Sequence, residues 1–401
     1  MKTTTIMPSC VETMKTNNFG QSVNNVMRNK NINLFFLFYS ILGVSLYGYE
    51  QSKKSRILLL FFICTTIWRI FFIIITSFIM YLFSDNFVDF YSIFVQSIKT
   101  QPLMKFSFIW SWRFLNLSNI VLIILFTFNG NVILKCFNNF ILIKYLNNHT
   151  KMMKIFIFRL FGFIFLLLFV IAIFFQNSND FTYLQVIVCY QIYFGYTYMI
   201  FFYDLNLLMF LLSKKILIKL KQKLDKINDN NLAKNDTFEL INDIKALGYN
   251  LYEFNRISSP GLFLILITTV FSYLNNIVVF ISRTEIHGHR MIYFHFFMNI
   301  LRSISICILS WTSQYILKQF DDIYFCLLDK SINTLRNNYS KYQKYSKAIT
   351  ISNSLQIYEL IIIRHYYKSY YFYEILPMCL ESLGFIFIFI FQYIIIFIET
   401  T

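Results

Sequence analysis

Residues 183–227 read YLQVIVCYQIYFGYTYMIFFYDLNLLMFLLSKKILIKLKQKLDKI, an apolar stretch that continues directly into a basic one. Its first part, 183–212, is long enough to cross the hydrocarbon core of a bilayer, which takes about 20 apolar residues. Beyond it, Leu and Ile recur at three- and four-residue spacing, at Ile216, Leu217, Leu220, Leu224 and Ile227. This periodicity predicts an amphipathic helix that leaves the membrane. Its cationic face is either the solvated side of a packing helix or a site for anionic lipid.

The composition of the whole chain agrees with a membrane protein. The 401 residues are 57% hydrophobic and only 14% charged, and the mean hydropathy is +0.54. A soluble globular domain would carry about 25% charged residues, and a disordered chain would be far less apolar. The apolar runs are continuous, whereas the strands of a membrane barrel alternate in polarity. We therefore predict an all-α fold, a polytopic helical membrane protein.

Eight apolar runs occur along the chain, and seven of them are predicted to cross the membrane. The predicted spans are 57–83, 113–135, 155–175, 183–212, 260–282, 291–316 and 377–398. The eighth run, 33–49, is shorter and contains Gly43 and Gly48. These features favour a re-entrant or interfacial helix over a full span.

The distribution of basic residues predicts the orientation. With seven spans, 27 of the 36 Lys and Arg residues fall on one side of the membrane and four on the other. Basic residues accumulate on the cytoplasmic side, so the N-terminus is predicted to lie inside. If the run 33–49 crossed as well, the basic N-terminal segment would lie outside, against this rule.

The same charge pattern divides the chain into predicted regions. A cytoplasmic N-terminal segment with the re-entrant helix covers 1–56, and a six-span bundle covers 57–316 and includes the long cytoplasmic segment 213–257. Cytoplasmic anchor helices cover 317–376, and the seventh span with a short extracellular end covers 377–401.

No sequence motif predicts catalysis or a bound metal. The patterns GxSxG, HExxH and the P-loop are missing, and the seven cysteines form no CxxC pair. His287 and His289 have no obvious third ligand nearby in the sequence. Because the net charge of +16 is explained by membrane orientation, it indicates no nucleic-acid partner. We expect a protein that is not an enzyme and needs no cofactor.

The last apolar run carries the most specific motif. It reads Phe385-Ile386, five hydrophobic residues FIFIF (387–391) and then Gln392-Tyr393. Together with the predicted topology, this run resembles the insect gustatory receptor family, part of the insect chemoreceptor superfamily. The last span of that family reads Thr-Tyr, five hydrophobics, Gln-Phe. Here the Thr-Tyr pair is absent, Tyr393 replaces Phe, and Phe387 stands where sugar-sensing members have Glu, so the resemblance favours the divergent, often bitter-sensing members.

The resemblance implies a receptor in the cell membrane that detects taste compounds and mediates acceptance or avoidance. Members are ligand-gated, non-selective cation channels assembled as homo- or hetero-tetramers, and they act in the dendritic membrane of gustatory neurons. The implied partners are a small-molecule tastant and the lipid bilayer, with plant secondary compounds favoured over sugars. An odorant receptor subunit of the same superfamily is the nearest alternative. A G-protein-coupled receptor would need the opposite orientation, and its Asp-Arg-Tyr and Asn-Pro-x-x-Tyr signatures are missing.

Gln392 is the main candidate for a pore residue. An amide in the hydrocarbon region needs a polar partner or water, and the resemblance places this span around a central pore. Residues on the same helical face would then form the gate and the outer mouth: Ile388, Phe389, Ile396 and Glu399. The alternative is that Gln392 makes one interhelical hydrogen bond and Glu399 is a solvated end residue.

Polar and aromatic residues in the outer halves of other spans are candidates for a ligand pocket. His295, Asn299 and Arg302 share one helical face, which predicts either a pocket wall or a structural hydrogen-bonded cluster. Spans 183–212 and 260–282 supply further candidates: Gln185, Tyr190, Gln191, Phe194, Tyr273 and Asn276. Because 20% of the chain is aromatic, such stripes also arise by chance.

Overall fold

The part of the chain that the computed structural model describes is helical, apart from one very short strand pair. The structure describes residues 35–37, 39, 56–82, 102–145, 161–162, 164–165, 168, 183–226, 234–281, 289–341, 371–372, 376–377 and 380–400. The helices are α4 (Arg56–Leu82), α7 (Pro102–Phe137), α8 (Phe140–Tyr145), α10 (Tyr183–Lys226), α11 (Lys234–Ile281), α12 (His289–Lys341) and α14 (Leu380–Thr400). Strands β1 (Tyr371–Phe372) and β2 (Leu376–Pro377) pair antiparallel. The predicted all-α class is confirmed for this part of the chain.

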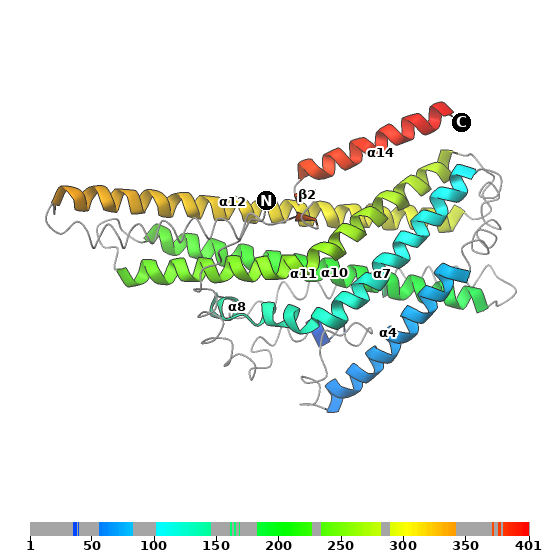
Figure 1. Ribbon diagram of the computed structural model, residues 1–401, viewed down its shortest axis with the longest axis horizontal. Helices are drawn as coiled ribbons and strands as arrows, with labels where there is room; N and C mark the ends of the chain where they lie inside the picture. Colours follow the sequence, from blue (N-terminus) through cyan, green and yellow to red (C-terminus); the bar gives the residue numbers. More distant parts are fainter. Residues whose placement is uncertain are drawn as a thin grey trace, which may run out of the picture.

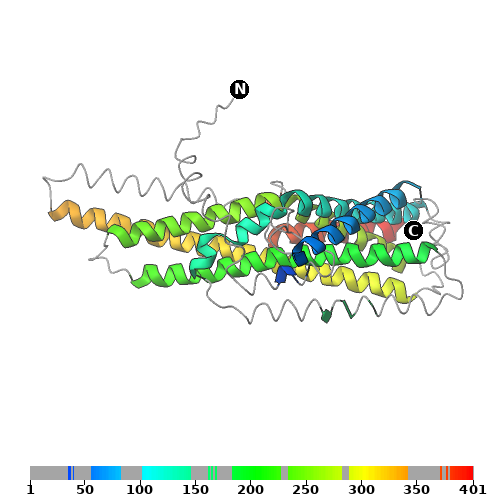
Figure 2. The ribbon, with the colours of Figure 1, turned by 90° about the horizontal axis from the view of Figure 1, so that it is seen from below.

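Three helices are far longer than a membrane is thick. Helices α10, α11 and α12 contain 44, 48 and 53 residues. At a rise of 1.5 Å per residue they measure about 65 to 80 Å, against about 30 Å for the hydrocarbon core of a bilayer. They contact one another and extend together along the long axis of the molecule, beyond α4, α7 and α14 (Figures 1 and 2). The predicted region boundaries at 213, 257 and 317 therefore lie inside continuous helices.

Helix α11 changes direction part-way along its length (Figure 1). Pro260 lies inside this helix, where its ring removes a backbone hydrogen bond and displaces the carbonyl one turn earlier. The residues after Arg256, 257–281, include no Asp, Glu, Lys or Arg. The proline thus lies close to the point at which α11 passes from a charged half to an apolar half.

Three helical stretches in the described residues are long and apolar enough to cross a membrane. They are Ile109–Phe137 in α7, Glu239–Leu274 in α11 and Phe296–Lys330 in α12. Two shorter apolar stretches are Phe62–Ile75 in α4 and Glu381–Tyr393 in α14. A fold of membrane type is thereby supported, whereas the count of seven spans stays a prediction. The predicted span 155–175 and the run 33–49 lie mostly outside the described residues.

Helix α4 has the polarity of a lipid-facing helix. Apart from Arg56 in its first turn and Cys64, its described exposed side chains are large and apolar: Ile57, Leu60, Ile63, Ile67, Trp68, Ile70, Phe71 and Ile74. Its buried side chains include two polar ones, Thr65 and Arg69, beside Phe72. In water this arrangement would expose a large apolar patch, but in a bilayer polar groups belong inside the bundle and apolar groups face lipid.

The basic end of α10 has the reverse polarity, as its sequence predicted. Ile216, Leu217, Leu220 and Leu224 are all at most 1% exposed and belong to the main hydrophobic core. That core also includes residues of α11 and α12 at similar three- and four-residue spacing: Ile241, Ile244, Leu247 and Leu251, and Ile316, Phe320, Ile323 and Leu327. The predicted amphipathic helix is confirmed over the described residues 213–226. Beyond the apolar segments, the three long helices pack like a soluble bundle.

Helices α7, α10 and α11 approach closely at Gly261. A Cβ atom at this position would lie 2.7 Å from Cζ of Phe202 in α10 and 3.0 Å from Cδ2 of Leu122 in α7. Both side chains are fully buried, so neither has space to retreat. Only glycine allows this packing distance without displacing a neighbour.

Replacing Gly261 with Val is therefore expected to destabilise the bundle. Overpacking of a filled core costs about 1 to 3 kcal/mol, and we expect a lower unfolding temperature for the detergent-purified protein. Gly248→Ala in the same helix is the control, because a Cβ there meets nothing within 4 Å and Ala gains about 0.5 to 1 kcal/mol of helix stability. Equal unfolding temperatures for the two variants would show that the contact at Gly261 is not tight.

Candidate functional site in the apolar bundle

Each of three apolar helical segments contains a single charged residue. Arg69 is the one Asp, Glu, Lys or Arg residue in 57–83, Asp204 in 183–212 and Arg302 in 291–316. All three side chains are buried in the structure. Ionisable residues inside a membrane are costly and usually face a bundle interior or an aqueous path, so these three positions are candidates for functional residues.

Arg302 of α12 joins two helices. Its Nη1 donates to Oδ1 of Asn299, one turn earlier, at 3.3 Å. Its guanidinium carbon lies 4.7 Å from the centre of the Tyr196 ring in α10, a cation–π contact. The sequence predicted either a pocket wall or a structural hydrogen-bonded cluster for His295, Asn299 and Arg302. The structure describes the side chains of Asn299 and Arg302, and these two are hydrogen-bonded to each other.

The Arg302 cluster also has unused hydrogen-bond donors. Nε and Nη2 of Arg302 and Nδ2 of Asn299 are buried, and no acceptor from the described residues lies within hydrogen-bonding distance of them. Buried donors without acceptors are rare, because each costs about 1 to 3 kcal/mol and more when charged. A carboxylate or carbonyl oxygen is the kind of acceptor that would satisfy such donors.

Tyr273 connects α11 to α12 and lies next to α14. Its hydroxyl oxygen accepts a hydrogen bond from Oγ of Ser303 at 3.0 Å. The two residues line a small cavity of about 20 Å³, whose other walls include Leu383, Ile386 and Ile390 of α14. This volume has room for about one water molecule, so no larger molecule fits here in this conformation. The predicted pocket residue Tyr273 lies at the joint between α14 and the rest of the bundle.

The other predicted pocket residues are placed only by their backbone. Gln185, Tyr190, Gln191 and Phe194 lie in the first turns of α10, Asn276 lies near the end of α11, and His295 lies near the start of α12. Their side chains lie outside the described part of the structure. The ligand-pocket hypothesis for these six residues therefore stays a prediction.

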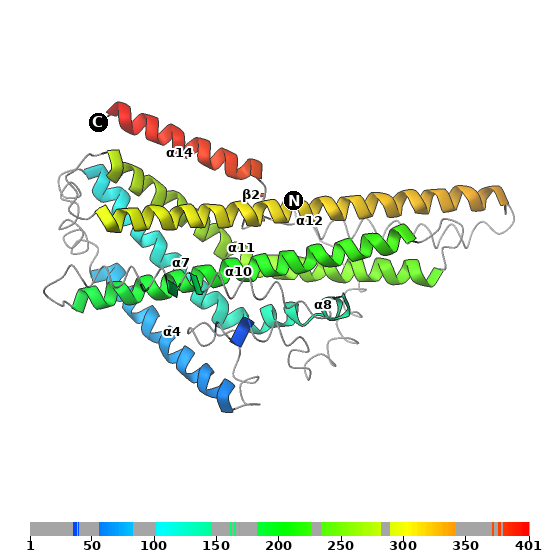
Figure 3. The same ribbon diagram turned by 180° about the vertical axis from the view of Figure 1, so that it is seen from behind.

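One side of helix α14 packs against the bundle, and the other side is uncovered. It lies at the edge of the bundle and contacts α11 and α12 (Figures 1 and 3). Leu383 and Ile390 are buried against them. The residues predicted to line a pore are on the uncovered side: Ile388 (56% exposed), Phe389 (61%), Gln392 and Ile396 (58%). Glu399 lies in the last turn, and its side chain is not described.

Two buried charges that the sequence reading did not single out have partners from other helices. Asp204 of α10 accepts a hydrogen bond from Tyr39 at 2.7 Å, and Nη1 of Arg69 in α4 donates to Oγ1 of Thr127 in α7 at 3.3 Å. Phe35 and Phe36 lie near Tyr39 and are buried with it. Searching each apolar run for its single charged residue would have found both positions.

Among the described residues, no group of three His, Cys, Asp or Glu side chains could hold a metal ion.

Comparison of the sequence with known proteins identifies no family for this chain. No protein-family model matches the sequence, and no curated protein matches it.

Proposed function

We propose that this chain is a subunit of a ligand-gated, non-selective cation channel that detects small molecules, of the type found in insect gustatory receptors. The uncovered side of α14 is the observation that carries the proposal. It presents the amide of Gln392 among Phe389 and Ile396, within the otherwise apolar stretch 383–398 of this helix. An amide is poorly accommodated by lipid, so this side calls for contact with other subunits and water.

Assembly around a central axis would bring the Gln392 side chains of several subunits together. They would form a polar ring, with Ile388, Phe389 or Ile396 as an apolar constriction that closes by losing its water. Glu399 would lie at one mouth, where carboxylates attract cations. In this proposal seven spans cross the membrane and the N-terminus is cytoplasmic, because that orientation places most basic residues inside.

The contacts of α12 supply a route from ligand to gate. An acceptor oxygen bound by Arg302 and Asn299 would alter the packing of α12 against Tyr196 of α10. One position along from Arg302, Ser303 is hydrogen-bonded to Tyr273 beside α14. A shift of α12 would therefore displace α14, because the cavity between α11, α12 and α14 has almost no free volume. The proposed ligand carries a carboxylate or carbonyl group, a description that fits many plant secondary compounds.

Expression of the chain alone in oocytes, with a panel of sugars, alkaloids and plant glycosides, tests the proposal. We expect cation currents and calcium entry that persist in excised patches. A response that G-protein inhibitors abolish, without ligand-evoked conductance in patches, would instead support a G-protein-coupled receptor. Current that appears only with an added co-receptor subunit would support the odorant receptor alternative.

A further inference from the structure

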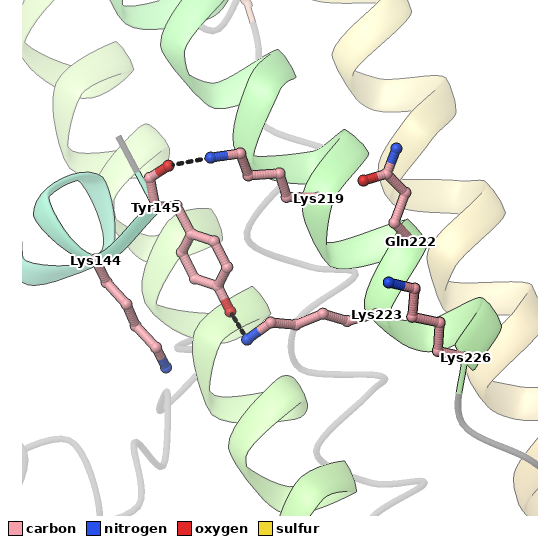
Figure 4. Close-up of a pocket in the computed structure, with 6 residues that line it drawn as sticks. All are labelled: Lys144, Tyr145, Lys219, Gln222, Lys223 and Lys226. Atoms are coloured by element: carbon pink, nitrogen blue, oxygen red, sulfur yellow. Dashed lines mark hydrogen bonds between the residues drawn. The ribbon is translucent and has the colours of Figure 1, made fainter. Parts of the chain in front are cut away.

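A second pocket lies far from the candidate ligand site, where α8 meets the basic end of α10 (Figure 4). Its volume is about 460 Å³, within the usual range for small-molecule sites. Four lysines, one tyrosine and one glutamine line it: Lys144, Tyr145, Lys219, Gln222, Lys223 and Lys226. Lys219, Lys223 and Lys226 are spaced by four and three residues and therefore share one face of α10.

The positive charge in this pocket is only partly compensated. Lys144 binds the carboxylates of Asp243 at 2.7 Å and Glu239 at 2.6 Å. Lys219 and Lys223 donate instead to uncharged oxygens of Tyr145, the backbone carbonyl at 2.6 Å and the hydroxyl at 2.9 Å, as Figure 4 shows. Within the described part of the chain, Lys219, Lys223 and Lys226 form no salt bridge. Three lysines thus present positive charge to one cavity.

The pocket is also preorganised. Tyr145 is 6% exposed and donates its hydroxyl proton to Asp243, which is 3% exposed. Burial, and then the hydrogen bond and charge of Asp243, raise the pKa of Tyr145 above its usual value, so the hydroxyl keeps its proton at neutral pH. Burial alone would lower the pKa of Lys144, but its hydrogen bonds to Asp243 and Glu239 outweigh this effect and raise it. Lys219 and Lys223 therefore donate to a buried tyrosine that Asp243 holds in place.

We infer that this pocket binds a polyphosphorylated ligand, such as a phosphoinositide headgroup or a soluble inositol polyphosphate. Ammonium groups on successive turns suit several phosphates, because Lys219 and Lys226 are separated by about 10 Å along the helix. A single small anion would engage only part of this row. If the predicted span ends at residue 212, Lys219 lies about 10 Å beyond it, about one Debye length from the anionic surface of the cytoplasmic leaflet.

Binding to the detergent-purified full-length chain tests this inference independently of any channel activity. The probes are a short-chain phosphatidylinositol bisphosphate, the matching free inositol trisphosphate and short-chain phosphatidylserine. We expect saturable binding of a phosphoinositide or inositol phosphate and much weaker binding of phosphatidylserine. The double variant Lys219→Gln/Lys223→Gln should lose at least about tenfold in affinity, since each lost charge-assisted hydrogen bond is among the strong ones.

The matched control is Lys221→Gln/Lys318→Gln, which removes the same charge from residues that do not line the pocket. It should bind within about twofold of the parent chain, because surface charges act weakly at a distance in salt. If the first double variant fails to fold, Lys226→Gln replaces it, because this side chain is exposed. Tighter binding of the lipid than of the free headgroup identifies a lipid site, and equal binding identifies a soluble ligand. Unchanged affinity in the pocket variants, or equal binding of phosphatidylserine, would overturn the inference.

Discussion

Gln392→Cys channels are expected to lose most of their ligand-evoked current when a positively charged, membrane-impermeant thiosulfonate reagent is applied. The reagent needs a thiolate in contact with water, and a residue that lines an open pore meets this requirement. A residue that faces lipid does not. The uncovered side of α14, on which Gln392 lies between Phe389 and Ile396, is the side that the proposal assigns to the pore.

Ile390→Cys is the matched control for this experiment. Ile390 lies two positions earlier in the same helix but is 5% exposed, because it packs against α11 and α12. Its current should resist the reagent, as should the parent chain with its native cysteines. Block in both variants, or in neither, would argue that α14 does not line the conduction path.

Arg302→Met is expected to abolish or strongly weaken the ligand response while leaving the protein folded. Replacing an incompletely paired buried charge by an apolar side chain of similar size is often neutral or stabilising, and Nε and Nη2 of Arg302 find no acceptor in the described part of the chain. The loss of a charge-assisted hydrogen bond to a ligand costs about 1.5 to 3 kcal/mol. This corresponds to about a tenfold to hundredfold rise in the concentration for half-maximal current.

Two further variants separate a ligand contact from a structural role for Arg302. Ser310→Ala removes from the same helix another buried group that has no partner among the described residues, and its response should match the parent. Arg302→Lys keeps the charge but loses the planar pair of donors, so it should recover only part of the sensitivity. If Arg302→Met unfolds at a much lower temperature, or responds like the parent, the cluster is structural and binds no ligand.

Local sequence patterns predicted the helices and the buried face at the end of α10 well. The three- and four-residue spacing of Ile216, Leu217, Leu220 and Leu224 was sufficient, because a helix with one apolar side must bury it. That Ile388, Phe389, Gln392 and Ile396 share one side of α14 also followed from the helical period. Which side is covered by α11 and α12 did not, since this depends on helices that are distant in sequence.

Contacts between distant residues account for what the sequence could not predict. Tyr145 and Lys219 are separated by 74 positions, so the lysines of α10 gave no sign of the pocket that they form with α8. Tyr39 and Asp204 are separated by 165 positions, and no local sequence pattern indicates that they form a pair. Asn299 and Arg302 were found because both donors lie on one turn of one helix, whereas Tyr196, the ring beneath the guanidinium, belongs to α10.

The central claim is that this chain by itself forms a ligand-gated cation pore. Its most direct test is single-channel recording from the purified chain in planar bilayers that contain no other protein, with a compound active in the oocyte panel. We predict ligand-dependent openings that carry sodium and potassium about equally, with a reversal potential near zero when the two ions are on opposite sides. A compound that binds the purified protein but evokes no openings in these bilayers would contradict the claim.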